Sequence, residues 1–71
     1  MQGVVKVYDP ATGAGVVVLD ADRREVFLRQ GSLAGSVFRL LRQGQRVVVE
    51  TTSEGDQEFV THVGLGTEGA P

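Results

Sequence analysis

The side chains of this chain that most often carry catalysis are few and isolated. His62 is the single histidine, there is no cysteine, and neither Ser32 nor Ser53 has a base close to it in the sequence. Glu58 is the one carboxylate at a ligand-like spacing from His62. A metal site needs several converging ligands, and a nucleophilic serine needs an adjacent base. We therefore expect no metal ion, no cofactor and no enzymatic activity.

Phe27 and Arg29 are the residues whose types and spacing best fit ligand binding. They alternate with Val26 and Leu28 over residues 25–29, and side chains two apart on a strand point to the same face. If the two aliphatic residues take the inside, Phe27 and Arg29 are exposed. An exposed ring stacks on flat groups such as nucleobases, and a guanidinium can stack on a base or contact a phosphate. A strand phenylalanine in the core is the alternative interpretation.

Valine-rich segments separated by turn residues predict a small all-β domain. We expect strands over residues 2–8, 14–20, 25–29, 45–52 and 57–63, with turns at 9–13, 21–24 and 53–56. Five short strands with one long connection after the third are typical of a small closed barrel. Within that connection, residues 36–43 fit either a short helix or a loop with one helical turn. Gly13 and Gly15 are interpreted as turn and close-packing residues, because no phosphate-loop lysine follows them.

Length and composition allow one small domain. The chain has 71 residues, ten of them glycine, and no stretch approaches the roughly 20 apolar residues of a membrane span. No secretory leader is visible, so we expect a cytoplasmic protein without a membrane partner. Residues 1–65 are expected to form the domain, and residues 66–71 a flexible tail.

Charge is distributed unevenly along the chain. The net charge is −2, yet all seven Lys and Arg lie in residues 1–46, where four carboxylates leave a balance of +3. Residues 47–71 carry five carboxylates and no Lys or Arg. A patch of positive potential can persist on an acidic protein, although a solvated surface without function explains the pattern equally well.

Four segments together resemble the bacterial cold-shock domain family over residues 2 to about 65. GVVKVYD (3–9) is similar to the family's glycine, two apolar residues and Lys-Trp-Phe-Asn. TGAGVV (12–17) resembles its Lys-Gly-Phe-Gly-Phe-Ile motif, and VFLRQ (26–30) resembles its Val-Phe-Val-His-Phe motif. VFRLLRQGQRV (37–47) is similar to its Gly-Phe-Lys-x-Leu-x-x-Gly-Gln-x-Val. The glycines remain, but four of the family's rings are replaced by Val7, Ala14, Val16 and Gln30.

The resemblance implies an all-β, five-stranded antiparallel OB-fold barrel of the cold-shock type that binds single-stranded RNA or DNA across its first three strands. It implies binding roles for Lys6, Tyr8, Phe27, Arg29 and Phe38. Each base stacked on a ring contributes about 1–3 kcal/mol. With four rings lost, we expect weak and largely sequence-tolerant binding.

The same substitutions leave a second function open. Val7, Ala14 and Val16 would form an aliphatic face where the family has rings. A sizeable exposed apolar face usually marks a partner site. The alternative hypothesis is therefore an OB-fold module that has lost nucleic-acid binding and serves protein interaction or self-association, such as a homodimer.

Overall fold

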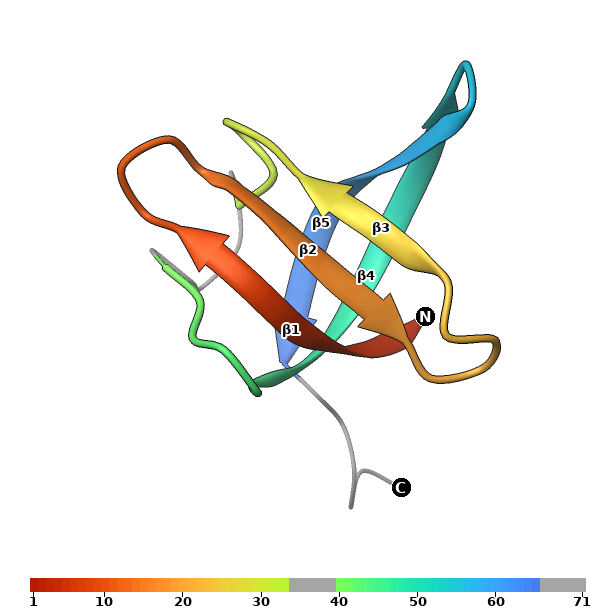
Figure 1. The fold of residues 1–71 in the computed structure, drawn as a ribbon, viewed down its shortest axis with the longest axis horizontal. Coiled ribbons are helices and arrows are strands. Elements are labelled where there is room, and N and C mark those ends of the chain that lie inside the picture. The colour runs from red at the N-terminus through yellow and green to blue at the C-terminus, as the bar shows by residue number, and fades with distance from the viewer. Residues whose placement is uncertain (34–39, 66–71) are drawn as a thin grey trace.

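The chain folds into a closed five-stranded β-barrel (Figure 1). The computed structural model describes residues 1–33 and 40–65. Its strands are β1 (Gln2–Asp9), β2 (Ala14–Leu19), β3 (Glu25–Leu28), β4 (Arg46–Glu54) and β5 (Gln57–Leu65). Their order around the barrel, β1-β2-β3-β5-β4, is consistent with an OB-fold-like barrel and confirms the predicted all-β class. The expected tail, residues 66–71, and Phe38 lie outside the described residues.

The expectation of a wholly antiparallel barrel is wrong at one strand pair. β3 pairs with β5 in parallel through Phe27 and Phe59, whereas β1–β2, β1–β4, β2–β3 and β4–β5 are antiparallel. The reason is geometric, since a closed ring of five strands cannot alternate in direction throughout. The parallel pair is the one between β3 and β5, which are neighbours in the barrel but not consecutive in the chain.

Aliphatic side chains, most of them valines, fill the barrel interior. The buried apolar residues are Val5, Val17, Leu19, Val26, Leu28, Leu41, Val47, Val49, Val60 and Val63. Val26 and Leu28 take the inside as predicted, so the residues between and beside them on β3 face outward. Valine is stiff about χ1 and packs well on a pleated surface. Each such side chain stabilises the fold by about 1.5–3 kcal/mol on burial.

Gly13 and Gly15 have the turn and packing roles that the sequence predicted. Gly13 has φ of +78°, in the left-handed region that favours glycine, and ends the turn between β1 and β2. At Gly15, an added Cβ would lie 2.6 Å from the carbonyl oxygen of Val7. Only glycine therefore allows β1 and β2 to approach this closely.

A β-bulge in β1 changes which residues face outward. The register with β2 shifts between Val5 and Val7. Val5 is buried, Lys6 and Val7 are both exposed, and Tyr8 packs against the core. An extra residue in one strand of a pair reverses the alternation beyond it. The side chains of Val7 and Tyr8 are therefore on the opposite faces from those that strict alternation from Val5 would give.

A second register shift, between Glu50 and Thr51 of β4, has the same effect on β5. Val60 and Val63 are both buried, with Thr61 and His62 both exposed between them. As a result Phe59 faces outward, although simple alternation would place it on the same face as Val63.

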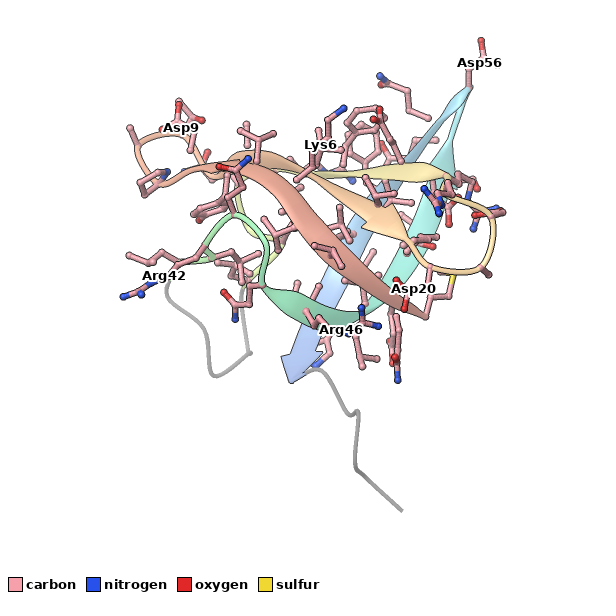
Figure 2. The ribbon with its side chains drawn as sticks, turned by 60° about the horizontal axis from the view of Figure 1, so that its bottom comes forward. Lys6, Asp9, Asp20, Arg42, Arg46 and Asp56 are labelled. Atoms are coloured by element: carbon pink, nitrogen blue, oxygen red, sulfur yellow. The ribbon has the colours of Figure 1, made fainter. Side chains whose placement is uncertain are left out.

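The hairpin between β4 and β5 is tighter than predicted. Glu54 pairs with Gln57, so the turn consists of Gly55 and Asp56 alone. Gly55 supplies the positive φ, +64°, that such a short turn needs. The hairpin extends past the body of the barrel (Figure 1), with Asp56 at its tip (Figure 2).

The long connection after β3 is only partly described. Of the predicted helix-or-loop segment 36–43, residues 36–39 lie outside the described residues, and residues 40–43 are not helical. Leu41 is buried in the core and anchors this end of the connection. In residues 1–33 and 40–65 there is no helix long and apolar enough to span a membrane.

Candidate functional site

One transverse row of apolar side chains crosses the outside of the barrel. Val7 on β1 pairs with Val16 on β2, Val16 pairs with Phe27 on β3, and Phe27 pairs with Phe59 on β5. We call these four residues the outer row. They come together because the β1 bulge turns Val7 outward and the β4–β5 register shift turns Phe59 outward. Val7 keeps 50% of its surface exposed, and the other three are partly exposed.

The outer row lines an apolar groove with a volume of about 460 Å³. The ring centroids of Phe27 and Phe59 are 6.2 Å apart, and the ring planes meet at 54°. The remaining lining residues are Asp9, Ala14, Gly15, Leu28 and Gln57. Two tilted rings in a shallow apolar groove can receive flat aromatic groups on their open faces.

Arg29 lies directly over one of these rings. Its guanidinium carbon is 4.1 Å from the centroid of Phe59, which is the geometry of a cation–π contact. Two guanidinium nitrogens donate hydrogen bonds to the two carboxylate oxygens of Glu54, at 2.9 and 2.5 Å. The hydrogen bond to Arg29, reinforced by the attraction between the charges, lowers the pKa of the Glu54 carboxyl and raises the pKa of the guanidinium.

Lys6 flanks the outer row on the other side and is also paired. Its Nζ lies 2.8 Å from a carboxylate oxygen of Glu25, and both side chains are about half exposed. Lys6 and Arg29, the two described cations predicted to bind a ligand, are thus each held by a carboxylate of the chain.

The uneven charge along the sequence is partly cancelled in space. Arg29 on the β3 side pairs with Glu54, and Arg24 pairs with Glu58 at 3.1 Å. Both pairs join the basic part of the chain to the acidic part. Arg46 and Asp20 form a further pair away from Lys6 (Figure 2).

Tyr8 belongs to a different part of the surface from Phe27. It packs against the core and lines a separate hollow of about 220 Å³ with Arg29, Gln30 and Leu33 among others. The β1 bulge is the cause, since it brings Tyr8 back to the inner side. Tyr8 and Phe27 therefore line different hollows, and Arg29, which lines the hollow of Tyr8, also lies over Phe59 in the groove.

Compared with known protein families and with curated proteins, the chain shows no match. Among the described residues, no three His, Asp or Glu side chains are grouped so that they could hold a metal ion.

Phe59 is the member of this site that sequence reasoning did not commit to. Its outward orientation could have been inferred, because Val60 and Val63 are both apolar and a bulge between them would turn both inward and Phe59 outward. Strict alternation along the strand instead places Phe59 on the same face as Val63. Of the five predicted binding residues, the structure brings Phe27 and Arg29 together around Phe59. It places Lys6 at the flank, and Tyr8 in a separate hollow that Arg29 also lines. Phe38 lies outside the described residues.

Proposed function

We propose that this chain is a non-enzymatic binding module of the cold-shock type that takes single-stranded RNA or DNA weakly and with little sequence preference. The observation that carries the proposal is the outward pair of rings, Phe27 and Phe59, in the apolar groove beside Arg29. Every nucleobase has a flat π-face, so stacking on such rings discriminates little between bases. A cytoplasmic location would give the module access to such strands.

Several features support weak binding. The outer row offers two rings, and its other two members are valines. Both flanking cations, Lys6 and Arg29, already have carboxylate partners. Stacking contributes about 1–3 kcal/mol per base, and each 1.4 kcal/mol changes affinity about tenfold. Two stacked bases without strong phosphate contacts correspond to a weak complex.

A second candidate, protein interaction through the outer row, has its own supporting observation. Val7 and Val16 make half of the row aliphatic, and Val7 is 50% exposed. A protein partner or a second copy of the chain would cover these side chains by apolar contact alone. Replacing a ring by an aliphatic side chain of similar bulk would then matter little.

Fluorescence anisotropy with labelled oligothymidine and a U-rich RNA at low salt tests the proposal. Phe27→Leu, which keeps apolar bulk and removes the ring, is expected to weaken binding about fivefold or more, because one stacking surface is lost. Val18→Ala is the matched control, since Val18 is also partly exposed on β2 but does not line the groove. Absence of saturation at millimolar wild-type protein would reject nucleic-acid binding and favour the second candidate.

A further inference from the structure

We propose that Glu54, beside the outer row, is a specificity-determining residue, which makes the groove select unpaired bases and keeps backbone phosphate from the two terminal nitrogens of Arg29. This inference rests on the proposed function, because it concerns how the same groove divides binding between bases and phosphates. It follows from three observations on Arg29, on the hairpin that carries Glu54, and on Lys6.

Arg29 is engaged on two sides by the protein itself. Its terminal nitrogens are used by both oxygens of Glu54, at 2.9 and 2.5 Å, in the paired geometry that a phosphate would otherwise occupy. One flat face of the guanidinium covers Phe59, with 4.1 Å between the guanidinium carbon and the ring centroid. A phosphate can take up this end-on, two-bond geometry on the guanidinium only by displacing the carboxylate.

The position of Glu54 is fixed by regular structure. It is the last residue of β4 and pairs with Gln57 across the two-residue turn. Arg29 directly follows β3, where its backbone N–H donates to the buried Ser32 hydroxyl at 2.9 Å. Since Glu54 ends a paired strand and the backbone of Arg29 is hydrogen-bonded to Ser32, forming the ion pair costs little additional backbone entropy.

The other flank of the outer row is arranged in the same way. Lys6 and Glu25 are 2.8 Å apart, so neither described cation beside the rings presents a charge without a counter-charge. The lowered pKa of Glu54 keeps its carboxylate ionised, and so able to pair with Arg29, across neutral and mildly acidic pH. A ligand therefore meets exposed rings and neutralised flanks, which favours contact through its bases.

The salt dependence of binding measures directly how much of the affinity comes from phosphate contacts. For single strands, the slope of log affinity against log salt is about −0.7 for each phosphate neutralised. Glu54→Gln releases Arg29, so we expect it to bind labelled oligothymidine about three- to fivefold more tightly at low salt. Its slope should be steeper than that of the wild type by about 0.7.

Asp20→Asn is the charge-matched control. It also removes one carboxylate from an arginine, here Arg46, and neither residue lines the groove. Both lie away from Lys6 (Figure 2). If wild type binds, Phe27→Leu weakens binding, and Glu54→Gln behaves like Asp20→Asn or binds less tightly, the inference is overturned while the proposed function stands.

A second measurement tests the ion pair of Arg29 and Glu54 without any nucleic acid. Inorganic phosphate is added while the NMR signal of the Arg29 Nε–Hε group is followed. We expect this signal to shift at lower phosphate concentration in Glu54→Gln than in the wild type. If no variant binds oligonucleotide, the proposed function fails by itself. Identical phosphate titrations in wild type and Glu54→Gln would overturn the proposed role of Glu54 as well.

Discussion

Phe27 on β3 and Phe59 on β5 are direct register partners, and their ring centroids are 6.2 Å apart. This contact forms at the one parallel strand pair of the described barrel. The two strands are separated in sequence by the long connection and by β4. Closure of the barrel is therefore what brings the two rings into one groove.

Phe59 should contribute to binding about as much as Phe27. Phe59→Leu removes the second ring and the surface on which Arg29 lies, so we expect affinity for oligothymidine to fall about fivefold or more. Fluorescence anisotropy at low salt measures this loss, with Val18→Ala as the control outside the groove. Equal affinity for Phe59→Leu and wild type would remove Phe59 from the site.

Gly15 should be required for the close approach of β1 and β2. In Gly15→Ala the new methyl group would lie 2.6 Å from the Val7 carbonyl oxygen and 3.0 Å from Leu28. Overpacking of this kind costs about 1–3 kcal/mol, so the free energy of unfolding should fall by that amount or more. Urea denaturation measures it. Gly64→Ala, where the nearest atom is 3.8 Å from an added Cβ, should change stability by less than about 0.5 kcal/mol.

Ser32 should be a structural residue that joins the end of β3 to β5. Its buried hydroxyl donates to the carbonyl oxygen of Val60 at 2.9 Å and accepts from the backbone N–H of Arg29 at 2.9 Å. Ser32→Ala leaves both groups without this partner, and we expect a loss of about 1–3 kcal/mol in urea denaturation. The exposed Ser53→Ala is the control. A loss no larger than that of the control would contradict this role.

The ion pair of Glu54 and Arg29 should make stability depend on pH in one direction. The pKa of Glu54 is lowered in the folded protein, so the unfolded chain takes up the proton more readily. The stabilisation is present above the ordinary glutamate pKa of about 4.3 and is lost as the pH falls through the lowered folded value.

Thermal unfolding of wild type and Glu54→Gln from about pH 7 to below about pH 4 checks this expectation. Wild type should have a higher Tm than Glu54→Gln at neutral pH, and the difference should shrink on acidification. The difference should be small, because both side chains of the pair are half exposed. Glu50→Gln corrects for the loss of one negative charge. A difference that grows as the pH falls would contradict the assignment.

Much of the fold could be predicted because hydrophobic periodicity and turn residues act locally. The alternation of Val26 and Leu28 with Phe27 gave the inward and outward faces of β3 correctly. The two bulges could not be read in this way. They depend on how a strand pairs with its neighbour, and they moved Tyr8 inward and Phe59 outward.

The ion pairs of the site could not be predicted from the sequence either. Glu54 is 25 residues from Arg29, and Glu25 is 19 residues from Lys6. Their approach depends on strand order and register around a closed barrel, which local patterns do not specify. A cation in a predicted binding position therefore says little about free positive charge until its neighbours are known.

In the proposed complex, unpaired bases lie on the outward rings of Phe27 and Phe59. NMR titration of the wild-type protein with oligothymidine tests it most directly, because a stacked base shifts the signals of the groups beneath it. We predict saturable shifts of the Phe27 and Phe59 ring protons and of the Val16 methyl groups, with the Val18 methyl groups unchanged. Unchanged ring signals, or saturable shifts confined to residues outside the groove, would show that bases do not stack on these rings.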